Sequence, residues 1–250
     1  GRPERPSRRQ FQESFVSNTD AAPASHGLAT NPLALSGDQI RSWRELERAA
    51  SGCTACRLCE DRTKVVFGDG AQDADVVVIG DAPGRTEDLL GRPFVGAAGN
   101  LLDNLLLDAG FDRDSVYVTT VVKCHPRTEA PDRDVVDACS PYLVEQLAHI
   151  RPRVIITLGP VATGLLLQRP VPLDKVAGFR FDVFDGVTLV PTHHPATVIK
   201  GNQTIVASIR RDLMTARAVL EGRLSTGAEA MAELRARADG ADPAAQDATA

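Results

Sequence analysis

Residues 75–84 read Asp75-Val76-Val77-Val78-Ile79-Gly80-Asp81-Ala82-Pro83-Gly84, and this stretch decides the fold that the sequence predicts. Its first half is a short β-branched run, typical of a strand buried on both faces in the middle of a parallel sheet. Its second half contains glycines and a proline, which allow a rigid turn that approaches a ligand closely. Because open α/β folds bind ligands at the carboxyl ends of their strands, we expect Asp81 at the ligand-binding edge of the sheet.

The loop after this strand does not match the common phosphate-binding motifs. It lacks the Gly-Lys-Ser/Thr ending of a P-loop and the G-x-G-x-x-G pattern of a dinucleotide site. The loop therefore indicates a site for a flat or anionic group. The alternative is an ordinary turn between a strand and a helix.

Further strands and helices alternate along the chain. Apolar runs predict strands at 115–122, 154–158 and 187–191, the last paired with 178–184 in a hairpin. Helical spacing of apolar residues predicts helices at 40–50, 100–109, 134–150, 161–168 and 205–220. This alternation predicts an α/β fold with a parallel sheet between helical layers.

Length and composition indicate one folded domain with two tails. The chain has 250 residues, of which 43% are hydrophobic, enough for one large core. We expect a disordered leader over 1–36, the folded domain over 37–223 and an Ala-rich tail over 224–250. No apolar run is long enough for a membrane span or a signal peptide, so we expect a cytoplasmic protein. The net charge of -5 excludes indiscriminate nucleic-acid binding but allows a local basic groove.

The five cysteines fall into two groups. Cys53, Cys56 and Cys59 are each separated by two residues, and Cys124 precedes Cys139 by fourteen intervening residues. In a cytosolic protein this clustering favours a metal site over disulfides. Zinc and a [4Fe-4S] cluster both accept four thiolates, and the spacing alone does not separate them; ordinary buried thiols are the third possibility. A shared site would be structural, because it would attach the N-terminal helix to the edge of the sheet.

Several functional side chains follow the predicted strand ends. Asp81 and Phe94 follow the first strand, Thr120 lies near the end of the second, and His194 follows the fourth, next to His193. A histidine and a carboxylate at one edge favour acid–base chemistry over a simple turn. Phe94 is either a core residue or a platform on which a flat ligand stacks.

These residues belong to four motifs that resemble one known family. In chain order the motifs are G-D-A-P-G-x-x-E-D-x-x-G-R-P-F-V-G-x-A-G, Y-V-T-T-V-V-K-C, T-L-G and P-T-H-H-P-A. They are similar to those of the family 4 uracil-DNA glycosylases, the thermostable type that carries an iron–sulfur cluster. The resemblance runs from about Cys53 to Leu213, and both tails lie outside it.

The resemblance implies a three-layer α/β/α sandwich with a central four-stranded parallel sheet. It also implies a [4Fe-4S] cluster rather than zinc, in a monomer that acts on uracil-containing DNA. Matching positions make the cluster ligands Cys53, Cys56, Cys124 and Cys139, with Cys59 as the spare cysteine.

The resemblance further implies that the enzyme flips uracil out of DNA, stacks it on Phe94 and hydrolyses its N-glycosidic bond. His194 matches the donor to the leaving base, and Asp81 matches the carboxylate that stabilises the oxocarbenium ion or orients water. The loop 192–201 would press into the duplex, with an aliphatic side chain filling the vacated stack. The other residues expected to contact the substrate are Gly80, Ala82, Gly84, Thr120 and, near phosphate, Lys200.

Two positions depart from the family pattern. The family commonly has Glu at the position of Asp81 and Asn at the position of Thr120. An Asn amide can donate to and accept from uracil at once, whereas a hydroxyl makes one short, rotatable contact. This leaves two alternatives to an ordinary uracil glycosylase. One is a weakly active or altered-specificity member that binds deaminated bases, and the other is an iron–sulfur redox or binding module, which would not require the rigid loop.

Overall fold

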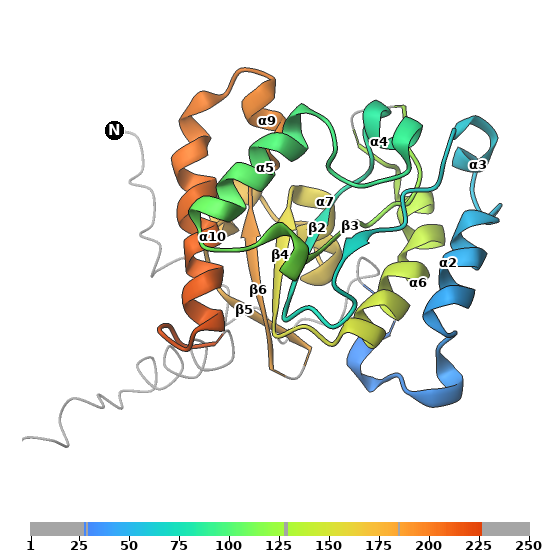
Figure 1. Ribbon diagram of the computed structural model, residues 1–250, viewed down its shortest axis with the longest axis horizontal. Coiled ribbons are helices and arrows are strands. Elements are labelled where there is room, and N and C mark those ends of the chain that lie inside the picture. The colour runs from blue at the N-terminus through green and yellow to red at the C-terminus, as the bar shows by residue number, and fades with distance from the viewer. Residues whose placement is uncertain (1–27, 29, 128–129, 185, 227–250) are drawn as a thin grey trace, which may run out of the picture.

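A computed structural model describes residues 28, 30–127, 130–184 and 186–226 and shows a six-stranded sheet in the order β1-β3-β2-β4-β6-β5 (Figure 1). Strands β3, β2, β4 and β6 are mutually parallel, which confirms the predicted four-stranded parallel centre. The edge strands β1 and β5 are antiparallel to their neighbours, so the whole sheet is mixed. The strand bounds are β1 Asp69–Gly70, β2 Val76–Gly80, β3 Tyr117–Thr120, β4 Val154–Leu158, β5 Phe181–Phe184 and β6 Val187–Thr192.

Helices cover both faces of the sheet, as the alternation of strands and helices predicts. Their bounds are α2 Trp43–Ser51, α3 Leu58–Asp61, α4 Arg85–Leu90, α5 Ala97–Asp108, α6 Arg133–Ile150, α7 Pro160–Leu166, α8 Leu173–Val176, α9 Ala196–Ile199 and α10 Val206–Leu220. Short 3-10 turns lie at η1 Pro32–Ala34, η2 Gly37–Gln39, η3 Arg113–Ser115 and η4 Gln203–Ile205.

Strand β2 lies in the middle of the sheet and is buried on both of its faces. Its side chains alternate, so Val76 and Val78 pack into the cluster formed with α5 and α10. Val77 and Ile79 pack on the opposite side with α6 and α7. All four side chains are excluded from solvent, which explains the unbroken β-branched run in the sequence.

The register of the parallel strands aligns their carboxyl ends. Gly80 pairs with both Thr120 and Leu158, and Leu158 pairs with Thr192. The residues that follow these positions therefore emerge at the same edge of the sheet. This is the edge at which the sequence placed the ligand site.

The folded part begins earlier than predicted. Leu28 is buried, η1 lies within the stretch expected to be a disordered leader, and the Arg151 guanidinium donates to the Leu33 carbonyl at 3.1 Å. In this segment Leu33 and Leu35 pack against the core cluster beside α6. Residues 1–27, residue 29 and the predicted tail over 227–250 lie outside the described residues. Across the described part of the chain, no helix has the length and apolar character needed to cross a membrane.

Candidate active site

Asp81 follows β2 directly and lies against the start of α7. Its Oδ1 accepts a hydrogen bond from the Ala162 amide at 2.8 Å. Gly159 has φ +109°, and a Cβ there would overlap the Asp81 carboxylate, so this glycine makes room for the acid. Burial raises the pKa of Asp81 to about 7, while amides of Ala162 and Val161 oppose the rise. Near neutral pH the group can therefore exist in either protonation state.

Phe94 is held in an uncommon backbone conformation beside Asp81's strand. Its φ of +53° lies in the left-handed region, which costs a non-glycine residue about 1 to 2 kcal/mol. Its ring covers Gly80, where an added Cβ would lie 2.6 Å from the ring Cζ. Gly99 in α5 leaves room for the Phe94 backbone, since a Cβ there would overlap the carbonyl group.

The Phe94 ring also stacks on His194. The ring centroids are 5.5 Å apart and the planes differ by 24°. The structure thus brings together two residues that the sequence placed after different strands. With Gly80 beneath it and His194 beside it, Phe94 is only 7% exposed.

His194 is a neutral hydrogen-bond donor in this environment. Its Nδ1 accepts the Ala196 amide at 3.1 Å, so the neutral ring carries its proton on Nε2. Burial lowers the pKa of His194 to about 4; the charge of Glu87 opposes this shift and that of Lys200 reinforces it. His193 instead lies with its Nε2 3.6 Å from an Asp174 oxygen. The two neighbouring histidines therefore have different surroundings.

Thr120 lies at the predicted position but does not present its hydroxyl proton to a ligand. The hydroxyl donates to the Val122 carbonyl at 2.7 Å, and the whole residue is buried. Its Cγ2 methyl lies on the side of Gly80, 3.5 Å from where a Cβ on that glycine would be. The Thr120 methyl and the Phe94 ring consequently share the surface above Gly80.

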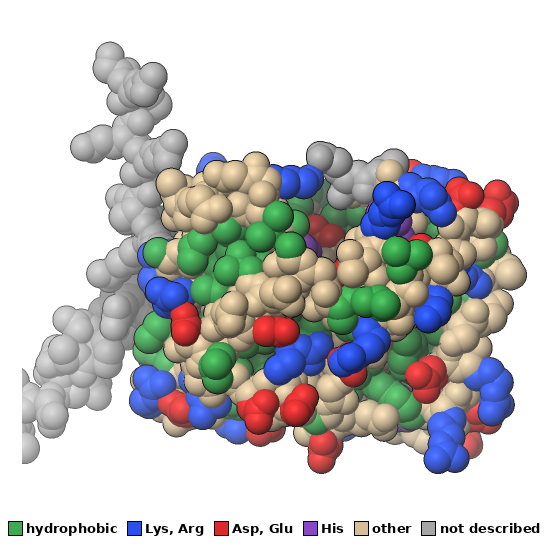
Figure 2. All heavy atoms as spheres, turned by 45° about the horizontal axis from the view of Figure 1, so that its top comes forward, with side chains coloured by type: hydrophobic (Ala, Val, Ile, Leu, Met, Phe, Trp, Pro, Cys, Tyr) green, Lys and Arg blue, Asp and Glu red, His purple; other side chains and the backbone are tan. Residues whose placement is uncertain are grey.

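The remaining predicted contact residues have different roles. Gly84 caps the N-terminus of α4, and Ala82 packs toward the core on the α6 side, so these two shape the loop. Lys200 ends α9 and is exposed, and its effect on His194 places its charge near the site. Ile199, the last residue of α9, is 53% exposed. Figure 2 shows this edge of the molecule, with a hollow whose floor contains acidic and histidine side chains and whose sides carry hydrophobic groups.

The sequence analysis did not single out two charged residues that lie near the site. Glu87 in α4 accepts the Val95 and Gly96 amides on one oxygen, at 3.0 and 2.9 Å; its only signal was its place in the first motif. Lys123 is completely buried, and its Nζ donates to Thr119 Oγ1, Thr120 O and Gln146 Oε1 at 2.6 to 2.7 Å. Burial lowers the pKa of Lys123 to about 7. No local pattern distinguishes this lysine from a surface one.

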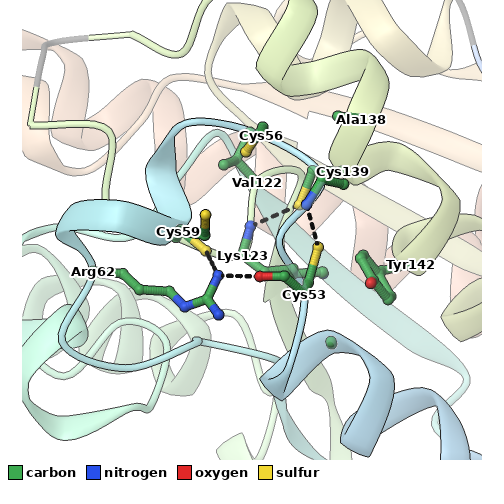
Figure 3. A pocket seen from close by; sticks show the side chains of 12 residues that line it. Cys53, Cys56, Cys59, Arg62, Val122, Lys123, Ala138, Cys139 and Tyr142 are labelled. Carbon is green, nitrogen blue, oxygen red and sulfur yellow. Dashed lines mark hydrogen bonds between the residues drawn. The ribbon is translucent and has the colours of Figure 1, made fainter.

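All five cysteines line one pocket (Figure 3). Cys53 follows α2, Cys124 follows β3 and Cys139 lies in α6. Burial raises the pKa of Cys124, and the nearby Cys56 and Cys53 thiols raise it further. Burial also raises the pKa of Cys139 to about 11, again with contributions from Cys124 and Cys56.

The cysteine pocket brings the predicted ligands together without grouping them as tightly as a bound metal would. Cys53 and Cys56 act on the pKa of Cys124, and Cys56 and Cys124 act on that of Cys139, whereas Cys59 contributes to neither shift. Arg62 reaches into the pocket, where its Nη1 contacts the Cys53 carbonyl at 2.7 Å and Cys124 Sγ at 3.7 Å. In the described part of the chain, no three His, Cys, Asp or Glu side chains are close enough together to hold a metal ion.

The segment that forms the carboxyl edge of the sheet is similar to known proteins. A model of the Uracil DNA glycosylase superfamily matches residues 67–214. A type-4 uracil-DNA glycosylase of Thermotoga maritima is 41% identical over 152 residues, which cover 59% of this chain and 78% of the relative. The type-4 enzyme of Saccharolobus solfataricus is 40% identical over 156 residues, covering 59% and 72%. That of Archaeoglobus fulgidus is 38% identical over 168 residues, covering 64% and 84%.

Proposed function

Since the chain belongs to the uracil-DNA glycosylase superfamily, we propose that it hydrolyses the N-glycosidic bond of uracil in DNA, with Asp81 and His194 as the residues that touch the reacting groups. The observation that carries this assignment is the alignment of strand ends. Gly80 and Thr192 both pair with Leu158, so Asp81 and the His194 loop emerge two strand spacings apart, about 10 Å. The acid and the donor thus lie on either side of the β4 end, and in this proposal the flipped nucleotide lies between them.

His194 stabilises the leaving base. Cleavage leaves negative charge on the departing pyrimidine, and a fixed donor aimed at that charge lowers the barrier. The Ala196 amide bond to Nδ1 leaves Nε2–H as the ring's donor. Because the ring stays neutral, it stabilises the anion by hydrogen bonding and gives up no proton in the step.

Asp81 acts in its ionised form. The sugar develops positive charge as the bond breaks, and a carboxylate near it stabilises that charge or orients the attacking water. The Ala162 amide at the start of α7 fixes the carboxylate. Burial makes the ionised form costly, so the acid is strongly attracted to a nearby cation.

Phe94 and α9 hold the flipped nucleotide and the DNA around it. The Phe94 ring gives the base a stacking surface, with Gly80 allowing the close approach. The exposed Ile199 fills the gap left in the duplex, and Lys200 lies near phosphate. Thr120 adds its methyl group and an acceptor oxygen, so base selection rests on stacking and on backbone groups of the 81–84 loop.

The cysteine pocket suits a [4Fe-4S] cluster held by Cys53, Cys56, Cys124 and Cys139. Four thiols with no carboxylate or imidazole among them are the donor set that such a cluster uses. Burial raises the pKa of Cys124 and Cys139, so their thiolates would gain a stabilising cation when the site is filled. The cluster would supply structural cross-links among the α2–α3 segment, the end of β3 and α6. Cys59, which matches no ligand position of the family motif, is the spare cysteine.

The decisive experiment is base release from a DNA oligonucleotide carrying one uracil. Purified protein should generate an alkali-labile abasic site, while an otherwise identical thymine oligonucleotide stays intact. Asp81→Asn and His194→Ala should abolish most of the release. Protein that contains its cluster and yet releases no uracil would support the redox or binding module instead.

A further inference from the structure

We propose that Glu87 is a positioning residue for the Phe94 ring, setting the surface on which the flipped base stacks. The inference rests on the proposed function, because it assigns a task to a residue that the reaction itself does not use. Glu87 lies in the first turn of α4, in the motif that links β2 to α5, and its carboxylate points back to the segment that follows Phe94.

Phe94 needs a restraint because its backbone is in a disfavoured region. With φ at +53°, the residue would relax to an extended or helical conformation if its flanks were free. Gly80 and Gly99 only provide room for the ring and the carbonyl group. Packing of the ring in the core and against His194 restrains the side chain, and a hydrogen bond to the next peptides would restrain the backbone.

The bond comes from one oxygen of Glu87. Oε1 accepts the amide of Val95 at 3.0 Å and the amide of Gly96 at 2.9 Å. Two amides that converge on one carboxylate oxygen fix the orientation of consecutive peptide groups. Because these peptides directly follow Phe94, they fix the angle at which its ring leaves the backbone and meets His194 at 5.5 Å.

Glu87 also lies within electrostatic reach of the other side of the site, since its charge acts on the His194 ring. One side chain thus binds the two amides that follow the stacking ring, and its charge reaches His194. A carboxylate that only anchored α4 to its surroundings would not need this position.

The adjacent Asp88 supplies a matched control. It is another carboxylate of α4 that accepts a backbone amide, but its partner is Thr63, at 2.9 Å, on the cysteine side of the helix. Asp88 is also more buried than Glu87. Loss of Asp88 should therefore release the Thr63 amide and leave the Glu87 bonds to Val95 and Gly96 in place.

The first test is a double-mutant cycle measured by single-turnover release of uracil. Glu87→Ala should slow release about 10- to 100-fold, the usual effect of losing hydrogen bonds to a charged group. Glu87→Gln, which retains an acceptor oxygen, should recover most of the rate. Asp88→Ala should stay within about threefold of the wild-type rate while unfolding at a lower temperature.

The cycle is closed with Phe94→Ala. If Glu87 acts through the ring, Glu87→Ala combined with Phe94→Ala should be no slower than Phe94→Ala alone. Multiplication of the two single effects would overturn the proposal, as would a rate for Asp88→Ala as low as that for Glu87→Ala.

A second measurement is independent of activity. Amide hydrogen exchange at Val95 and Gly96 should accelerate in Glu87→Ala and remain slow in Asp88→Ala. Unchanged exchange in Glu87→Ala would overturn the proposed positioning. If the wild-type protein released no uracil but exchange changed as expected, the proposed function would fail while the restraint on Phe94 would stand.

Discussion

The Thr120 hydroxyl donates to the Val122 carbonyl at 2.7 Å, so its proton is committed within the chain. The side chain therefore offers a bound base an acceptor oxygen and a methyl group, where an Asn amide would offer both a donor and an acceptor. If Thr120 faces the base as proposed, we expect it to select bases less strongly than an Asn amide would. Two amino-acid changes separate the contribution of the hydroxyl from that of the methyl.

Replacement of Thr120 by Asn should sharpen selection for uracil. Wrong bases leave buried donors or acceptors unsatisfied, at about 1 to 3 kcal/mol each, so an added amide increases discrimination. We expect the native enzyme to prefer U opposite G over U opposite A, because a mispaired base flips more easily, and to act on related deaminated bases. The measurement is a panel of single-turnover rates on U·G, U·A, hypoxanthine and cytosine substrates.

Thr120→Val provides the control for this panel. It keeps the methyl group on the side of Gly80 and removes only the acceptor oxygen, a single contact, so the rate ratios among substrates should change much less than in Thr120→Asn. Identical ratios for Thr120→Asn and the native enzyme would show that this side chain does not face the base.

Asp81→Asn should make the protein more stable at pH 8 while removing activity. The folded-state pKa of about 7 is above the ordinary value of 3.8, so the folded protein takes up a proton that the unfolded chain releases between these values. This stabilising protonation is complete below about pH 4 and is lost as the pH rises through 7. Asn avoids the cost of the buried charge and still accepts the Ala162 amide. In chemical unfolding, the free energy of unfolding of Asp81→Asn should exceed that of the native protein by on the order of 2 to 4 kcal/mol at pH 8, and the two should be equal near pH 4. The same difference at both pH values would contradict the raised pKa of Asp81.

Activity should rise with pH around neutrality because Asp81 must be ionised. His194 cannot produce this rise, since its pKa of about 4 leaves it neutral throughout the range. Single-turnover rates between pH 5 and 9 should follow one ionisation with a midpoint near 7. A midpoint near 4, or the same midpoint in Asp81→Asn, would exclude Asp81 as the ionising group.

His194 rather than His193 should carry the catalytic effect. Loss of one donor to developing charge typically costs about two to three powers of ten in rate, which we expect for His194→Ala. His193→Ala removes a ring that faces Asp174, and its rate should fall by less than about tenfold. Greater impairment in His193→Ala would reverse the assignment.

The sequence predicts the sheet and its functional edge because these depend on local patterns. The β-branched run of β2 and the proline-containing turns that follow Gly80 and Thr192 are enough to place Asp81 and His194 after strand ends. The edge strand β1 was not predicted, because its two residues are too few to show the alternation of apolar and polar side chains that marks a strand.

The features of the site that the sequence did not predict depend on contacts made only in the folded chain. Side-chain chemistry suggested a free hydroxyl on Thr120, but a carbonyl two residues away takes its proton. Glu87 was visible as a motif residue, yet its two amide partners are eight and nine residues away. A lysine is normally expected at the surface. Lys123 is buried because its ammonium group donates hydrogen bonds to polar groups of β3 and to Gln146.

The cysteine pocket makes its own prediction, which separates ligand thiols from a spare one. Individual Cys→Ala changes at Cys53, Cys56, Cys124 and Cys139 should remove visible absorbance and iron and should lower the unfolding temperature, because each removes one link among α2, β3 and α6. Cys59→Ala should do neither, since Cys59 lines the same pocket but matches no ligand position of the family motif. Iron content, absorbance and thermal unfolding of the five variants, purified side by side, make the comparison. Zinc in place of iron would exclude the cluster, and equal iron loss in Cys59→Ala and Cys53→Ala would overturn the choice of ligands.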